Sequence, residues 1–138
     1  MDLYWNDAVD MREGLKSMVG RTFVRVEGSV GDQEMLFVAD NGEKFLFTHF
    51  QDCCESVDIN DIVGDLQDLV GEPLLIAEQV DGEVPADWED QYYESYTFTF
   101  YKFATRKGYV DVRWLGESNG YYGEGVDLCH IKLSESHS

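Results

Sequence analysis

The stretch RTFVRVEGSVGDQEMLFVADNGEKFLFTHF, residues 21–50, carries the clearest structural signal in the sequence. It holds three runs rich in β-branched and aromatic residues, separated by Gly31-Asp32 and by Asn41-Gly42. Asn-Gly between two such runs is a strong signal for a type I′ hairpin turn. Residues 21–50 are therefore predicted to form a three-stranded antiparallel meander.

Two helices are predicted on either side of this meander. The first covers residues 6–18, because Asn6 suits an N-cap and Gly20 suits the end of a helix. Its apolar face would contain Ala8, Met11, Leu15 and Met18. The second covers residues 58–70, with Asp58 or Asn60 as the cap and Gly71 and Pro73 after it. Its apolar stripe would contain Ile59, Ile62, Val63, Leu66, Leu69 and Val70.

Further strands are predicted over residues 73–80, 92–105, 109–116 and 126–133, with Val110, Val112 and Trp114 facing inward. The sequence thus predicts a single α+β domain, residues 1–138, with an antiparallel meander of about seven strands and two helices. Residues 134–138 are expected to be frayed.

Charge is the strongest feature of the composition. Ten Lys and Arg face 28 Asp and Glu, which gives a net charge of −18, and no Lys or Arg lies between Lys44 and Lys102. Such a chain repels phosphate, so direct nucleic-acid binding is not expected, whereas a basic protein surface would be attracted. The predicted acidic face contains Asp58, Asp61, Asp65, Asp68, Glu83, Asp87, Glu89 and Asp90.

Neither a membrane span nor a signal peptide is expected. The apolar runs are short, and the first residues, MDLYWNDAVD, are acidic. Three cysteines form no disulfide framework, which is typical of a protein in a reducing cytoplasm.

The segment THFQDCCESVDIND, residues 48–61, is compatible with a metal site, a thiol nucleophile, a ligand pocket or a structural corner. Zinc is disfavoured, because adjacent cysteines in an extended chain point in opposite directions and there is no CxxC pair. Cys53 or Cys54 could pair with His49 or His130, but the surrounding carboxylates disfavour a thiolate. No metal, cofactor or catalytic residue is therefore predicted, and an enzyme is the least favoured reading.

The glycine-rich segment WLGESNGYYGEG, residues 114–125, does not match a phosphate-binding loop. Asn119-Gly120 is a turn signal that accounts for the glycines. Tyr121 and Tyr122 beside Trp114 would form either a stacking wall for a planar ligand or the packed tyrosines of a turn.

These two segments carry a resemblance to a known family. HFQDCCESVDINDIVGDLQDLVGEPLLIAEQ and SYTFTFYKFATRKGYVDVRWLGESNGYYGEGVDL resemble a family of small tailed-phage proteins of uncharacterised activity, with His-x-x-Asp-Cys-Cys-Glu and Ser-Asn-Gly-Tyr-Tyr segments. The resemblance covers residues 45–128 and leaves the helix within residues 1–20 outside. Where the family usually has Gln after the His, this chain has Phe50.

The resemblance implies a phage origin and action in the host cytoplasm, but no reaction. It also implies that the family's marker residues gather into one site that binds a ligand or partner. With Trp114, the residues of that site would be His49, Asp52, Cys53, Cys54, Glu55, Asn119, Tyr121 and Tyr122.

Two functions follow as hypotheses. The first is a non-enzymatic phage accessory protein that binds a host protein with a basic surface, by DNA mimicry or otherwise, and inhibits or redirects it. The second is a small-ligand or nucleotide-signal binding protein with a pocket at His49–Glu55, Trp114 and Asn119–Tyr122. A homodimer is also expected if residues 92–103 form an exposed edge strand.

Overall fold

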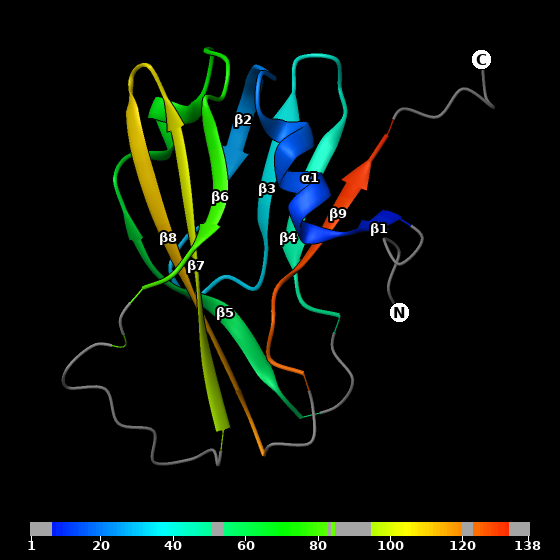
Figure 1. The fold of residues 1–138 in the computed structure, drawn as a ribbon, viewed down its shortest axis with the longest axis vertical. Coiled ribbons are helices and arrows are strands. Elements are labelled where there is room, and N and C mark those ends of the chain that lie inside the picture. The colour runs from blue at the N-terminus through cyan, green and yellow to red at the C-terminus, as the bar shows by residue number, and fades with distance from the viewer. Residues whose placement is uncertain (1–6, 51–53, 83, 85–94, 120–122, 133–138) are drawn as a thin grey trace.

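The computed structural model describes residues 7–50, 54–82, 84, 95–119 and 123–132. They form two antiparallel sheets, one of five strands and one of four (Figure 1). The five-stranded sheet contains, in spatial order, β1 (Ala8–Val9), β9 (Asp127–Ile131), β4 (Lys44–Thr48), β3 (Met35–Ala39) and β2 (Phe23–Glu27). The four-stranded sheet contains β5 (Ser56–Val63), β8 (Gly108–Ser118), β7 (Ser95–Thr105) and β6 (Ile76–Val80).

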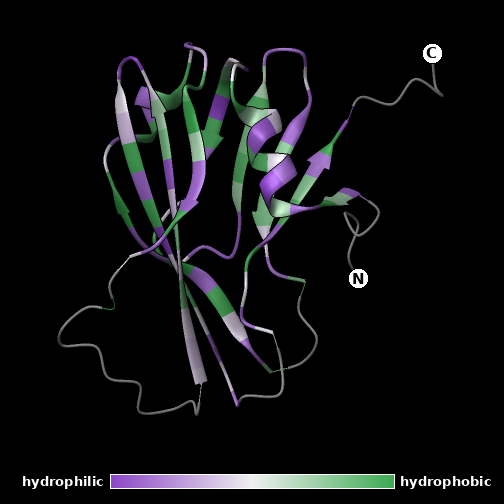
Figure 2. Ribbon diagram, in the orientation of Figure 1, coloured by the Kyte–Doolittle hydropathy of each residue, from purple (hydrophilic) through white to green (hydrophobic). Residues whose placement is uncertain are grey.

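An aromatic core joins the inner faces of the two sheets. The rings of Phe37 on β3 and Phe103 on β7 have centroids 4.9 Å apart, and those of Phe47 on β4 and Tyr101 on β7 are 5.3 Å apart. All four side chains are buried. Figure 2 shows hydrophobic and hydrophilic residues alternating along the long strands, as expected when only one face of each sheet is buried.

Two short helices pack against strands of both sheets. The helix α1 (Met11–Met18) begins at Asp10, whose carboxylate accepts a hydrogen bond from the backbone of Glu13, and it packs against β6 and β9. Gly14 allows this close approach, since a Cβ there would lie 2.4 Å from the Leu128 side chain. The 3₁₀ helix η2 (Leu66–Leu69) packs against β2, β7 and β8.

The predicted fold class is wrong in its strand count, its topology and its second helix. The described residues contain nine strands in two sheets and one α-helix, whereas about seven strands in one meander were expected. The chain leaves the first sheet after β4 and enters the second at β5, so these consecutive strands do not pair. Facing sheets let the aromatic residues of β3, β4 and β7 bury one another.

The helix predicted over residues 58–70 is instead the strand β5 followed by η2. Val57 and Ile59 face inward at a spacing of two residues, and an irregularity between Ile59 and Asp61 then brings Ile62 inward. A bulge in a strand can therefore give its apolar residues the spacing that is typical of a helix. Gly64, with φ +113°, ends the strand.

The first helix is correct in type but shorter than predicted, because Ala8 and Val9 pair with β9 as β1. The three-stranded meander is confirmed as β2, β3 and β4. Its Asn-Gly turn is not of type I′, since of its two residues only Gly42 has a positive φ (91°). The Gly42 N–H donates to the Ala39 carbonyl over 2.9 Å, which is typical of a type I turn followed by a glycine bulge.

Between Phe100 and Ala104 the strand β7 is not at an edge, because it pairs with β6 on one side and with β8 on the other. Its first residues, 95–99, pair only with β8 among the described residues, so the homodimer through residues 92–103 stays a prediction. Within the described part of the chain, no helix combines the length and apolarity needed to cross a bilayer.

Candidate functional site

His49 connects two segments that are far apart in the sequence. It follows β4 on the same side as Phe45 and Phe47, so its ring reaches the end of the core. Its Nε2 lies 2.7 Å from the Glu55 carboxylate, and its Nδ1 lies 2.8 Å from the Gly125 carbonyl. The side chains of His49 and Glu55 are only 10% and 0% exposed.

The partners of His49 fix the proton count of this pair. A carbonyl oxygen only accepts, so Nδ1 carries a hydrogen and donates to Gly125. The short contact between Nε2 and Glu55 then requires one more proton, either on His49 as an imidazolium or on Glu55 as a carboxylic acid. The pair is electrically neutral in both forms. The Asp127 carboxylate lies 3.9 Å from Nδ1.

Glu124 forms a second buried contact beside this pair. One carboxylate oxygen accepts a hydrogen bond from the Thr97 hydroxyl over 2.8 Å, and the other accepts one from the Ser118 hydroxyl. Glu124 crosses the inner face of β8 at Gly116, where a Cβ would lie 2.1 Å from the Glu124 carbonyl. Only glycine leaves room for this crossing.

We refer to these side chains as the polar junction, which consists of His49, Glu55, Thr97, Ser118 and Glu124. The junction connects His49, Glu55 and the segment 123–127 to the ends of β7 and β8. The carboxylates and the imidazole of the junction are hydrogen-bonded to other groups of the chain. This arrangement is typical of a structural hydrogen-bond network rather than of an accessible active site.

The structure brings together the described ends of the two marker segments. Ser56 pairs with Glu117, so Glu55 and Ser118 lie at the same end of the β5–β8 ladder. Cys54 and Asn119, the next residues outward, are exposed. Asp52, Cys53, Tyr121 and Tyr122 lie outside the described residues.

Trp114 does not form a surface wall for a planar ligand. It is 1% exposed, lies between Ile59 and Thr99 in the sheet, and belongs to the core. Neither its indole N–H nor the buried Tyr101 hydroxyl has a hydrogen-bond partner among the residues that the structure describes. Burial, together with the nearby charge of Asp127, raises the pKa of the Tyr101 phenol well above its usual value.

The described residues offer little for metal or thiol chemistry. No group of three His, Cys, Asp or Glu side chains among them has the arrangement of a metal site. Cys54 is disulfide-bonded, contrary to the expectation of reduced cysteines, so it supplies no thiolate. Cys129 is not disulfide-bonded, and it is buried in the sheet.

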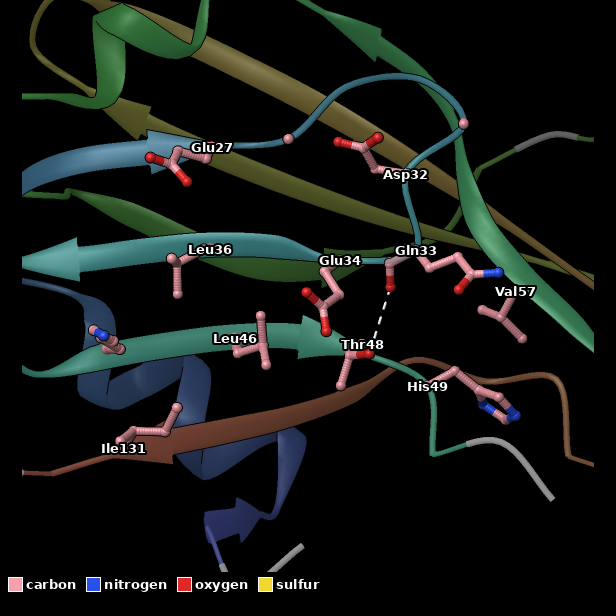
Figure 3. Close-up of a pocket in the computed structure, with 13 residues that line it drawn as sticks. Glu27, Asp32, Gln33, Glu34, Leu36, Leu46, Thr48, His49, Val57 and Ile131 are labelled. Carbon is pink, nitrogen blue, oxygen red and sulfur yellow. Dashed lines mark hydrogen bonds between the residues drawn. The ribbon is translucent and has the colours of Figure 1, made fainter. Parts of the chain in front are cut away.

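His49 also lies at one end of a hollow of about 860 Å³ on the outer face of the five-stranded sheet. Figure 3 shows Leu36, Leu46 and Ile131 on three neighbouring strands of this hollow. Glu34 and Asp32 border it as well. This hollow was not apparent from the sequence, because it combines β3 and β4 with β9, which is distant from them in the chain.

The predicted acidic face is divided by the fold. Asp58 and Asp61 lie on the outer face of the four-stranded sheet, whereas Asp65 caps η2 and Asp68 lies in it. Burial raises the pKa of the Asp58 carboxyl. The remaining predicted residues, Glu83, Asp87, Glu89 and Asp90, lie outside the described part of the chain.

The outer face of the four-stranded sheet also carries a row of aromatic side chains that sequence reasoning did not assign to a surface. Tyr96, Phe98 and Phe100 follow one another along β7 at ring separations of 5.9 and 6.3 Å. Their alternation with Thr97, Thr99 and Tyr101 was visible in the sequence, but the inward face is the one with Thr99 and Tyr101.

Carboxylates surround this aromatic row. Asp61 is opposite Arg113, and Lys102 lies between Asp111 and Glu78 in the register of the strands. We refer to this surface as the acidic-aromatic face, which consists of Asp58, Asp61, Glu78, Tyr96, Phe98, Phe100 and Asp111.

Comparisons with known proteins place the chain in a family. Neither the curated proteins nor the solved structures contain a match to it. A family described as a domain of unknown function, DUF7448, matches residues 16–128, a longer part of the chain than the resemblance over residues 45–128 covered. The match begins within α1 and ends in β9. The chain therefore belongs to the DUF7448 family.

Proposed function

We propose that this protein is a non-enzymatic binding protein that docks its acidic-aromatic face onto a basic surface of another protein. The observation that carries the proposal is the combination, on one sheet face, of a row of aromatic rings with an excess of carboxylates. Aromatic side chains are common anchors of protein interfaces, and complementary charge directs the choice of partner.

The two cations on this face are already engaged. The Arg113 Nε donates to the Asn60 side chain over 2.7 Å, and the guanidinium carbon lies 5.6 Å from the centroid of Phe98. Lys102 is flanked by Glu78 and Asp111, and its Nζ lies 5.3 Å from the centroid of Tyr109. The remaining negative charge attracts a basic surface and repels an acidic one.

A shallow hollow of about 490 Å³ on this face supplies a place for a basic side chain. Asp61, Glu78, Phe100 and Asp111 are among the residues that line it. An arginine of the partner can stack on an aromatic ring there, as Arg113 does on Phe98, while its guanidinium meets a carboxylate.

The resemblance to tailed-phage proteins gives the proposal a setting, namely a basic host protein in an infected bacterial cell. The layout of the charges supports a complementary protein surface more than DNA mimicry. Lys102 and Arg113 interrupt the carboxylates, whereas a DNA backbone presents a continuous series of negative charges.

The second hypothesis, a ligand pocket at the marker residues, has less support. His49 and Glu55 are bonded to each other, and Trp114 is a core residue. A ligand there would have to replace buried hydrogen bonds that the chain already makes.

The proposal can be tested by affinity capture from a bacterial lysate with three baits. These are the natural protein, a face variant (Asp61→Asn, Glu78→Gln, Asp111→Asn) and a control variant (Glu13→Gln, Glu27→Gln, Asp40→Asn). Both variants lose the same charge, but the control sites are exposed and lie away from this face. Any captured protein is then purified, and its affinity for each bait is measured at low and high salt.

We expect a basic protein to bind the natural and control baits alike, to bind the face variant at least about tenfold more weakly, and to dissociate in high salt. Equal affinity for the face variant and the natural protein, or affinity that ignores salt, would show that the partner does not use this face.

A further inference from the structure

The hollow on the outer face of the five-stranded sheet has an apolar floor. Leu36 on β3 is opposite Leu46 on β4, and Ile131 on β9 is opposite Lys44. Three adjacent strands thus place aliphatic side chains on the same surface, although the outer face of a sheet is normally polar. This floor can cover the apolar part of a ligand.

The two ends of the hollow carry opposite charges. Lys44 begins β4, and Glu34 lies beside Thr48 at its other end, because Met35 pairs with Phe47. Four residues of strand separate these ends by about 13 Å. Asp32 adds a second carboxylate at the Glu34 end and accepts a hydrogen bond from the Ser29 backbone.

The charged groups at the two ends are available to a ligand. Lys44 and Glu34 are exposed, and neither forms an ion pair with another described residue. Glu27, on the side of the hollow, is different, because it pairs with Arg25 over 2.6 Å. The available charges are therefore one ammonium at one end and carboxylates at the other.

We propose that this hollow binds an extended zwitterion, of which a short peptide with free termini is the natural example. Its ammonium lies at Glu34 and Asp32, its carboxylate at Lys44, and its apolar side chains on Leu36, Leu46 and Ile131. A peptide of about four residues spans the distance in extended conformation. This site lies on the other sheet from the acidic-aromatic face, so it does not depend on the proposed function.

The net charge of the protein makes this proposal easy to separate from unspecific attraction. A chain with a net charge of −18 attracts any cation and repels any anion. Unspecific attraction therefore ranks a cationic peptide first, a zwitterion second and an anionic peptide last. A site with Lys44 at one end ranks the zwitterion first, because only the zwitterion uses both ends.

The test uses three forms of one peptide, Ala-Leu-Leu-Ala with free ends, with an acetylated amine, and with an amidated carboxylate. Each is titrated into the full chain while the methyl NMR signals of Leu36, Leu46 and Ile131 are followed. We expect the free peptide to bind tightest, and each blocked end to weaken binding about twofold to fivefold, as for exposed ion pairs.

Two variants with matched controls locate the ends. Lys44→Gln should weaken the free and acetylated peptides but not the amide, and Lys16→Gln on α1 should change none of them. Glu34→Gln should weaken the free peptide and the amide, and Glu13→Gln should not. The proposal is overturned if the amide binds tightest, if Lys44→Gln has no effect, or if the methyl signals of the floor do not move.

Discussion

The polar junction and the acidic-aromatic face use the same residue types for opposite purposes. In the junction, Glu55 and Glu124 are buried and each is bonded to a neighbouring side chain. On the face, the carboxylates of the half-buried Asp58 and the exposed Glu78 have no hydrogen-bond partner among the described residues. A buried carboxylate needs partners in order to be tolerated at all, whereas an exposed one can remain available to a second molecule. Substitutions in the junction should therefore change stability, and substitutions on the face should change binding.

The largest expected effect is that of Glu55→Ala. It leaves the His49 ring buried without its partner, so the free energy of unfolding should fall by about 3–5 kcal/mol. Urea unfolding followed by fluorescence measures this change, and Glu34→Ala, an exposed site, should change it by less than about 0.5 kcal/mol. The double variant His49→Ala/Glu55→Ala should be destabilised by less than the sum of the two single variants. Simple additivity would mean that the pair does not act as a unit.

A smaller loss is expected for Gly116→Ala. The added methyl would meet the Glu124 carbonyl, and relief of that clash should cost about 1–3 kcal/mol of stability. Gly123→Ala is the matched control, because nothing lies within 4 Å of a Cβ at that position. If both variants unfold at the same urea concentration, segment 123–127 does not cross β8 as described.

Glu43, at the other end of the sandwich, should make stability depend on pH. Its hydrogen bond from His130, 2.6 Å long, is the main cause that lowers the pKa of Glu43 below its ordinary value of 4.5, and the Arg21 charge adds to it. A lowered pKa means that the stabilisation is present above the unfolded-state value and is lost as pH falls through the folded-state value. The stability difference between the natural protein and Glu43→Gln should therefore shrink as pH falls below about 4.5. A difference that stays constant down to pH 3 would argue against this pair.

The smallest effect on stability, and of opposite sign, is expected on the acidic-aromatic face. Burial raises the pKa of Asp58, so its charge costs stability as pH rises above its ordinary value of 3.8. Asp58→Asn should therefore slightly raise the unfolding midpoint at pH 7 and leave it unchanged near pH 3. The same variant should bind a basic partner more weakly, which calorimetry measures. Loss of stability at pH 7 would instead indicate that Asp58 belongs with the junction.

Local sequence patterns predicted the individual strands and helices better than the way in which they assemble into two sheets. The meander of residues 21–50 was predictable, because alternation and turn residues act over short distances. The division into two sheets was not, since it depends on which aromatic faces meet across the core. The helix predicted over residues 58–70 failed for a specific reason, namely that the irregularity at Ile59 and Asp61 gives a strand the spacing of a helix.

The site was predictable only in part. His49, Glu55 and Ser118 were identified as marker residues, and the structure brings their segments together. Their partners Thr97, which is exposed, and Glu124, which is buried, carried no signal, because the sequence does not show which hydroxyl a carboxylate will bind. The aromatic row on β7 was visible, but which of its two faces points outward depends on the second sheet.

The position of β9 has a consequence for how the protein is made. β9 is the last of these strands to leave the ribosome, yet it lies between β1 and β4 in its sheet. Until residues 127–131 are free, β4 exposes an unpaired backbone edge beside Phe45 and Phe47, which is a template for pairing with another nascent chain. The five-stranded sheet therefore closes only after residues 127–131 have left the ribosome, and chains cut short before Asp127 are expected to aggregate.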